Sequence, residues 1–340
     1  MKEYSIWFEE KERASLRCRD FSGELTGSQV LVKADYSVIS AGTELANYHA
    51  LPNTSIEGHP CTYPRHPGYS GSGHVIAVGP DAVNLKIGDN VAVVWSGHKN
   101  YFVQDEDFNL HKLPDGVDLK SAAFTHVASF PLLGVRKLQI QLGEAVMVAG
   151  LGLLGLIAVQ AAKLSGAYPV LACDFSEERR NLALQLGADY ALDPREEDFI
   201  GKVRALTDGK GPAATVEVTG TLPGLQRALE YTAFMGRIVI LGCTRISDQP
   251  INVYRYIHGK GLHIIGSHDR SRPQAESHQG AWTARDDYKT FFKLIAAGAM
   301  KVFPLINKVV SPLEAEAVYR EIGFGKNPPL GVLFDWQNFE

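Results

Sequence analysis

The spacing of apolar positions changes part-way along this chain. From about residue 127 onward, short apolar runs alternate with longer segments of helical spacing, such as Glu177–Leu186 and Leu222–Phe234. Short, continuously apolar runs suit strands that are buried on both faces of a parallel sheet. The alternation therefore predicts an α/β domain with a doubly wound, six-stranded parallel sheet. The expected strands are Val146–Ala149, Val170–Asp174, Tyr190–Leu192, Thr215–Val218, Ile238–Leu241 and Leu262–Gly266.

The first 120 residues instead show strand-like runs separated by glycine-rich turns. Strands are expected at Val30–Ala34, His74–Gly79 and Asn90–Val94, and glycines at their ends favour a compact β-barrel-like domain. The segment Ser40–Tyr69 is expected to be irregular, and long irregular loops in compact domains are usually functional or mobile. After Gly266 a polar loop precedes an α+β tail. We expect residues 1–126 and 267–340 to form one domain and residues 127–266 the other.

The first strand of the α/β region leads directly into a glycine motif, Gly150-Leu151-Gly152-Leu153-Leu154-Gly155. In G-x-G-x-x-G the first glycine makes a tight turn, the second lets backbone approach a pyrophosphate, and the third lets a helix pack on the strand. The N-terminal amides of that helix face the phosphates. Asp174 follows 24 residues after Gly150, where a carboxylate accepts hydrogen bonds from the adenosine ribose. The pattern predicts an NAD site, and a structural βαβ unit without ligand is the alternative.

The composition limits the classes of protein to consider. Hydrophobic residues make up 45% and charged residues 21% of 340, as in ordinary soluble proteins of two domains. A net charge of −4 gives no reason to expect nucleic acid or an anionic membrane as partner. The charged start of the chain and the lack of a long apolar stretch predict a cytoplasmic location. Four scattered cysteines argue against a disulfide framework and a four-cysteine zinc site.

Five segments spread along the chain are more specific: Ser40–Glu44, Pro67–Gly73, Leu85–Val91, Gly150–Gly155 and Asn181–Asp189. Together they resemble the medium-chain dehydrogenase/reductase superfamily over nearly the whole length. The resemblance implies a GroES-like β-barrel-type catalytic domain and a Rossmann domain, with the active site in the cleft between them, often in a dimer or tetramer. The first segment is also similar to a branch that contains bacteriochlorophyllide dehydrogenases and sugar- or polyol-dehydrogenase-like proteins.

The residues that bind zinc in that superfamily are mostly replaced in this chain. Ala41 stands where the zinc alcohol dehydrogenases have a cysteine, and Tyr69 and Ser70 stand where they have a histidine and then a glutamate. His126 aligns with the third ligand. A catalytic zinc needs about three protein ligands and an open position. The resemblance therefore predicts a site without metal.

Without a metal, the oxidation of an alcohol still needs a group that accepts the hydroxyl proton. The resemblance places His126 beside the reacting carbon, and histidine suits this role. It also places Thr43 and Tyr69 near the substrate oxygen, with Glu44 orienting Thr43 or His126. Each residue has a plainer interpretation: a partly buried histidine that caps the interdomain helix, a threonine in a loop turn, a tyrosine that fills the vacated metal site, and a carboxylate ion-paired between domains.

Ligands of doubly wound sheets bind at the carboxyl ends of the strands. The predicted cofactor contacts are therefore Gly150, Gly152, Leu153, Leu154, Gly155, Asp174, Phe175, Arg179, Thr219, Gly220, Leu241, Gly242, Gly266 and Ser267. Substrate is expected to contact the polar loop 267–283 through Arg270, Arg272 and Trp282, and also Trp95. A solvated, mobile loop is the alternative. His49, His59, His66 and His98 are expected on the surface or in loops, and not as ligands.

These features predict an NAD(H)-dependent, zinc-independent oxidoreductase that interconverts a secondary alcohol and a ketone on a sugar, polyol or related metabolite. One rival is a metal-free reductase of activated C=C bonds in quinones or enones; such enzymes tend to prefer NADPH, so Asp174 counts against it. A second rival is a non-enzymatic NAD-binding protein, which the polar groups near the predicted cleft disfavour. The expected partners are a small-molecule substrate and further copies of the chain, with no nucleic acid and no membrane.

Overall fold

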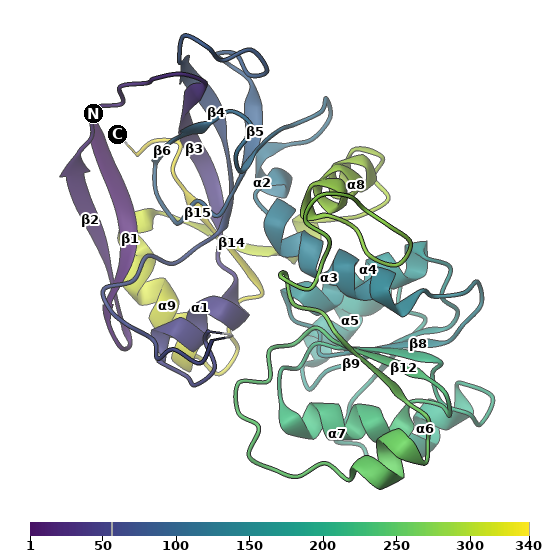
Figure 1. Ribbon diagram of the computed structural model, residues 1–340. Helices are drawn as coiled ribbons and strands as arrows, with labels where there is room; N and C mark the ends of the chain where they lie inside the picture. Colours follow the sequence, from purple (N-terminus) through teal and green to yellow (C-terminus); the bar gives the residue numbers. More distant parts are fainter. Residues whose placement is uncertain (56, 340) are drawn as a thin grey trace. The chain divides into compact units, whose positions relative to one another are not determined.

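The computed structural model describes residues 1–55 and 57–339. The chain divides into two compact units (Figure 1). The first unit consists of Met1–Val127, Phe292–Gly298 and Val302–Glu340, and the second of Ala128–Phe291 and Ala299–Lys301. Among the described residues, no helix is both long and apolar enough to span a lipid bilayer.

The first unit is built on a seven-stranded sheet with the order β14-β15-β3-β4-β5-β7, in which β6 also pairs with β3. A separate hairpin is formed by β1 and β2. Large apolar side chains, including Phe8, Tyr319, Phe334 and Trp336, are fully buried in its core. The strands are β1 (Lys2–Glu10), β2 (Arg13–Asp20), β3 (Gln29–Val38), β4 (Ser70–Val78), β5 (Asn90–Val94), β6 (Tyr101–Asp105), β7 (Leu110–Lys112), β14 (Ile306–Val310) and β15 (Gly331–Asp335).

A helix interrupts the segment that the pattern predicts to be irregular. The helix α1 (Ala41–Tyr48) lies within Ser40–Tyr69, so that prediction is wrong for its first part; Ile56 lies outside the described residues. Gly42 in the first turn has poor helix propensity, so the sequence pattern does not predict this helix. Glu44 stabilises the start of α1, because its carboxylate accepts a hydrogen bond from the Ser40 N–H at 2.7 Å. The unit also contains α2 (Leu119–Ala122), α9 (Ala315–Phe324) and the short turns η2 (Phe303–Leu305) and η3 (Pro312–Glu314).

The second unit confirms the doubly wound fold. Its six strands are all parallel, in the order β10-β9-β8-β11-β12-β13. Helices lie on both faces of this sheet, with α4 and α5 on one side and α6 and α7 on the other (Figure 1). The strands are β8 (Val146–Ala149), β9 (Val170–Cys173), β10 (Tyr190–Leu192), β11 (Ala214–Glu217), β12 (Arg237–Ile240) and β13 (His263–Gly266). The helices wholly within this unit are α4 (Leu153–Leu164), α5 (Glu177–Gln185), α6 (Phe199–Ala205), α7 (Leu222–Tyr231) and the π-helical turn η1 (Tyr254–His258). Two helices are shared by the units: α3 (Thr125–Leu138) starts in the first unit, and α8 (Ala284–Ala296) ends in it.

The segment that follows β13 differs from the sequence prediction. The pattern assigns residues 267–291 to the barrel-type domain, whereas the structure places them in the second unit. Buried polar bonds explain the difference, because Arg272 donates to Asp287 on α8 and to the Ser129 carbonyl on α3, both in that unit. The loop is therefore anchored to the helices that cover the parallel sheet.

Candidate active site

The carboxyl ends of the parallel strands in the second unit lie in register. Ala149 at the end of β8 pairs with Cys173 and with Glu217, which in turn pairs with Ile240, and Ile240 pairs with Gly266. The loops that follow these five strands therefore emerge along one edge of the sheet. Most of the predicted cofactor residues lie in these loops, so the structure brings them together at that edge.

The three glycines of the motif differ in what surrounds them. Gly150 has φ +94°, and a Cβ there would lie 3.0 Å from the Thr219 nitrogen. A Cβ at Gly155 would lie 1.9 Å from the Gly150 carbonyl oxygen, so α4 packs on β8 only if this residue is glycine. Gly152, which precedes α4, has no heavy atom within 4 Å of its Cβ position. The protein thus requires the first and third glycines, while the space beside the second is open, as a pyrophosphate would need.

Asp174 shapes this glycine turn. One carboxylate oxygen accepts from the Leu151 N–H at 2.8 Å, and the other accepts from the Ser176 N–H at 2.8 Å. Each carboxylate oxygen has a further acceptor site. The predicted bonds to ribose hydroxyls therefore remain compatible with this geometry and stay a prediction.

Arginines surround the turn after Asp174. Phe175 is exposed, and the Arg195 guanidinium lies 5.6 Å from its ring centroid. Arg180 donates to the Asp174 carbonyl at 2.7 Å and pairs with Asp193 at 3.2 Å. Hydrogen bonds from Arg195, followed by the charges of Arg195 and Arg180, hold the pKa of Asp193 below its usual range. The guanidiniums of Arg180 and Arg195 are thus hydrogen-bonded within the protein. The predicted contact Arg179 lies in the first turn of α5.

A second group of predicted residues meets in the first unit. The Tyr69 hydroxyl donates to Ser40 Oγ, and the Tyr69 ring packs edge-on against His126 with centroids 5.4 Å apart. The Trp95 ring lies 4.7 Å from the same imidazole. His126 is fully buried, whereas Trp95 is 55% exposed and has φ +56°. We call Ser40, Tyr69, Trp95 and His126 the tyrosine cluster.

Glu44 does not orient Thr43 or His126, and this correction follows from its contacts. Besides the Ser40 N–H, the buried carboxylate accepts from His98 Nε2 at 3.0 Å and from the Tyr319 hydroxyl. The other His98 nitrogen lies 2.7 Å from Ser37 Oγ. His98 lies in the loop between β5 and β6, one of the two kinds of position expected for it, but it is fully buried and not on the surface. The plainer interpretation of Glu44, a carboxylate ion-paired between domains, does not fit either, because Ser40, His98 and Tyr319 all belong to the first unit.

Comparisons with known proteins identify the family. A family profile described as "Zinc-binding dehydrogenase" matches residues 154–290. The chain is 33% identical to L-threonine 3-dehydrogenase of Pyrococcus furiosus, over 70% of this chain and 73% of that protein. It belongs to the medium-chain dehydrogenase/reductase superfamily. It is also 29% identical to D-guloside 3-dehydrogenase of Escherichia coli K12, over 70% of this chain and 68% of that one. A dehydrogenase structure from Sinorhizobium meliloti 1021, solved with NADP bound, is similar with a TM-score of 0.81 at 20% identity, covering 98% and 99% of the two chains.

Membership makes this protein an oxidoreductase of the alcohol dehydrogenase type, and the non-enzymatic rival is set aside. The zinc site of this superfamily does not fit the residues present. Ala41 has no ligand atom, and the Tyr69 hydroxyl is bonded to Ser40. Within residues 1–55 and 57–339, no three His, Cys, Asp or Glu side chains group as a ligand set.

Two of the predicted substrate residues have structural roles instead. Arg272 is buried and donates to Asp287 at 3.1 Å and to the Ser129 carbonyl at 3.2 Å. The Arg136 guanidinium lies 3.5 Å from the Trp282 ring centroid and donates to Asp287 at 2.7 Å. Arg272 is thus not available to hold substrate, and one face of Trp282 is covered. Arg270 is exposed, so its predicted role in substrate binding stays open.

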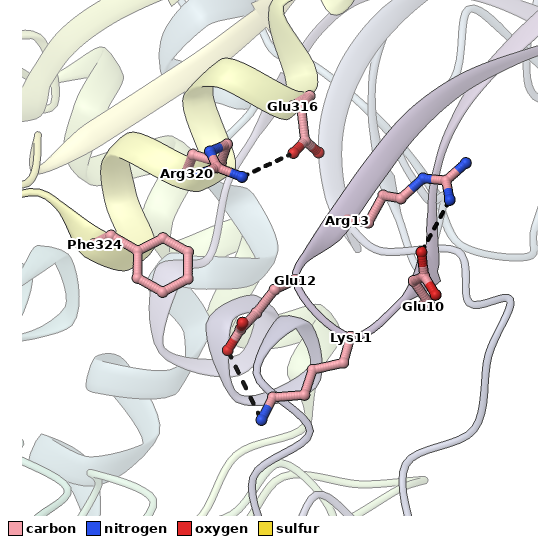
Figure 2. A pocket seen from close by; sticks show the side chains of 7 residues that line it. All are labelled: Glu10, Lys11, Glu12, Arg13, Glu316, Arg320 and Phe324. Carbon is pink, nitrogen blue, oxygen red and sulfur yellow. Dashed lines mark hydrogen bonds and ion pairs between the residues drawn. The ribbon is translucent and has the colours of Figure 1, made fainter.

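A shallow hollow of about 450 Å³ lies elsewhere, between the β1–β2 turn and α9 of the first unit (Figure 2). Its charged side chains pair with one another, as Arg13 with Glu10 at 2.9 Å and Arg320 with Glu316 at 3.8 Å. No residue predicted to bind cofactor or substrate lines it.

Proposed function

We propose that this protein is an NAD(H)-dependent dehydrogenase that interconverts a secondary alcohol and a ketone without a catalytic zinc. The observation that carries the proposal is the tyrosine cluster. At the position of a metal-ligating histidine stands a tyrosine whose hydroxyl is fixed by Ser40, beside a buried histidine. A hydroxyl group and an imidazole, both able to accept and donate protons, thus stand where the zinc enzymes have metal ligands.

The second unit supports the cofactor assignment. Bound NAD would supply the hydride acceptor, and this chain's residues would hold it through the open space at Gly152 and the N-terminus of α4. Asp174 favours NAD over NADP, because a carboxylate accepts from a ribose hydroxyl and repels a 2′-phosphate. The Sinorhizobium meliloti structure was solved with NADP bound, so this preference needs a direct measurement.

The tyrosine cluster supplies the acid–base part of the proposal. Loss of hydride from the alcohol carbon must be accompanied by loss of the hydroxyl proton, and without a metal a side chain has to accept it. We assign this role to His126 and the placement of the substrate oxygen to Tyr69 and Thr43. Ser40 fixes the direction of the Tyr69 hydroxyl.

For the substrate we propose a sugar, polyol or related hydroxylated metabolite. The relative that acts on a D-guloside at its 3-position supports this class. The exposed Trp95 of the tyrosine cluster also suits this class of substrate, because an aromatic face packs against the apolar C–H groups of a hydroxylated carbon chain.

A spectrophotometric screen tests the function. Purified protein is mixed with sugars, glycosides, polyols, quinones and enones, each with NAD, NADP, NADH and NADPH, and the reduced-nicotinamide band is followed. We expect NAD-dependent oxidation of at least one polyol or glycoside. Turnover confined to enones or quinones with NADPH would contradict the proposal. Light scattering of the same sample tests the expected dimer or tetramer.

A further inference from the structure

Glu217 lies at the carboxyl end of β11, at the centre of the strand ends that carry the predicted cofactor residues. Its pairing partners are Ala149, which precedes Gly150, and Ile240, which precedes Leu241. The glutamate is fully buried, although glutamate is among the residues least often found inside. No motif in the sequence draws attention to it.

The contacts of Glu217 join three loops. Its carbonyl accepts from the N–H groups of Leu241 and Gly242 at 2.9 and 2.8 Å. Its Oε1 accepts from the Thr219 N–H at 2.8 Å and from the Thr219 hydroxyl. Thr219 in turn packs against Gly150. The carboxyl group therefore holds the loop after β11 against the glycine motif after β8.

The loop after β12 is joined to this edge by the backbone of Glu217, whose carbonyl accepts from Leu241 and Gly242. A Cβ at Gly242 would lie 2.4 Å from the Gly220 nitrogen, so the loops after β11 and β12 touch through their backbones. The side chain of Glu217 itself binds Thr219, which lies against Gly150.

The surroundings of the carboxyl group favour its uncharged form. Burial raises the pKa of Glu217, and the bonds from Thr219 and Gly220 oppose that shift only in part. The titratable groups that interact with it in this core are Cys173, whose pKa burial raises to about 12, and Tyr231, whose pKa burial also raises. Neither neighbour carries a positive charge that would stabilise a carboxylate. Ionisation as the pH rises would leave an unpaired buried charge, which is costly.

We propose that Glu217 is the positioning residue of the cofactor site: its buried carboxyl group holds Thr219, and with it the loop after β11, beside the glycine motif that faces the nicotinamide dinucleotide. The inference rests on the proposed function only in taking this edge as the cofactor site. It does not depend on which alcohol is oxidised.

Two variants and a matched control test it. Glu217→Gln keeps an uncharged oxygen acceptor for Thr219, whereas Glu217→Ala removes it. The control is Thr215→Val on the same face of β11, which breaks the buried 2.7 Å bond to Thr232 without touching the loops. NADH binding is measured by fluorescence titration between neutral and alkaline pH. We expect about tenfold or greater weakening for Glu217→Ala, and near-wild-type affinity for Glu217→Gln and for the control.

The retained acceptor oxygen separates positioning from simple loss of core stability. Glu217 Oε1 accepts from Thr219 in either protonation state, so wild type and Glu217→Gln should bind NADH with similar affinity across this pH range, whereas Glu217→Ala should bind it more weakly throughout. Glu217→Ala that binds NADH as well as the control, or Glu217→Gln that binds it as weakly as Glu217→Ala, would overturn the proposal.

Amide hydrogen exchange in cofactor-free protein gives an independent measurement. The Thr219 amide should exchange faster in Glu217→Ala than in Thr215→Val, because its acceptor is the Glu217 side chain, and equal rates would also overturn the proposal. If wild-type protein binds neither NADH nor NADPH, the proposed cofactor fails, while the exchange rates still decide the role of Glu217. Should Glu217→Ala not fold, Glu217→Leu, which removes the acceptor oxygen but keeps the volume, takes its place in both measurements.

Discussion

Replacing Asp174 by serine tests both the cofactor preference and its cause. The charge of Asp174 would repel a 2′-phosphate, and juxtaposed like charges cost several kcal/mol. A difference of about 3 kcal/mol corresponds to roughly a hundredfold in affinity. We therefore expect wild type to favour NADH over NADPH by about that factor, and Asp174→Ser to bring the two within about tenfold.

The structure adds a second effect to this variant. Both Asp174 oxygens accept backbone N–H groups, from Leu151 and Ser176, each at 2.8 Å. A hydrogen bond to a charged group contributes about 1.5–3 kcal/mol, so the serine variant should also bind NADH about tenfold more weakly and melt at a lower temperature. Asp174→Asn keeps one acceptor oxygen and should lose less stability while still narrowing the preference for NADH over NADPH.

The measurement is kcat/KM and Kd for NADH and NADPH with wild type, both Asp174 variants and Ser176→Ala. Ser176 caps α5 by accepting from the Arg179 N–H at 3.3 Å, so its loss costs about 1 kcal/mol of stability without changing charge. The control, Ser176→Ala, should leave the ratio of the NADH and NADPH affinities unchanged. Wild type that uses NADPH better than NADH, or an Asp174→Ser ratio equal to wild type, would refute the reasoning.

Three further predictions concern the metal, the proton acceptor and the loop after β13. Exhaustive chelation should leave turnover intact, and elemental analysis should find well under one zinc per chain; a stoichiometric zinc whose removal abolishes activity would contradict this. His126→Asn should lower kcat about 10²–10⁴-fold with NADH affinity little changed; if it keeps the wild-type kcat and pH profile while Tyr69→Phe does not, Tyr69 is the proton acceptor. Arg272→Ala should destabilise the protein by about 1.5–3 kcal/mol, because it removes one of the two arginine partners of buried Asp287, whereas exposed Arg270→Ala should leave the melting temperature unchanged. An unchanged melting temperature for Arg272→Ala would refute its structural role.

The parallel sheet could be read from the sequence because its signals are local. Four-residue apolar runs such as Val146–Ala149 and the spacing Gly150–Gly155 follow from neighbouring residues alone. The helix α1 could not be predicted because Gly42 weakens the local pattern; its start is stabilised by the bond from the Ser40 N–H to the Glu44 carboxylate.

The polar contacts of the site could not be predicted, because they join residues far apart in the chain. Glu44 and His98 are separated by 54 positions, and nothing in either neighbourhood signals their 3.0 Å bond. Arg270 and Arg272 are only two positions apart, yet one is exposed and the other buried. An irregular loop has no fixed period, so no rule of alternation tells such residues apart.

The backbone of Trp95 has a consequence for protein engineering. Residues other than glycine rarely adopt the φ of +56° found at Trp95, and such a backbone conformation costs on the order of 1–3 kcal/mol. A redesign that ranks substitutions by thermostability alone would replace this exposed ring by glycine or asparagine and report an improvement. The improved protein would have lost the ring that covers His126. Position 95 should therefore be held fixed in any stabilised version intended to retain activity.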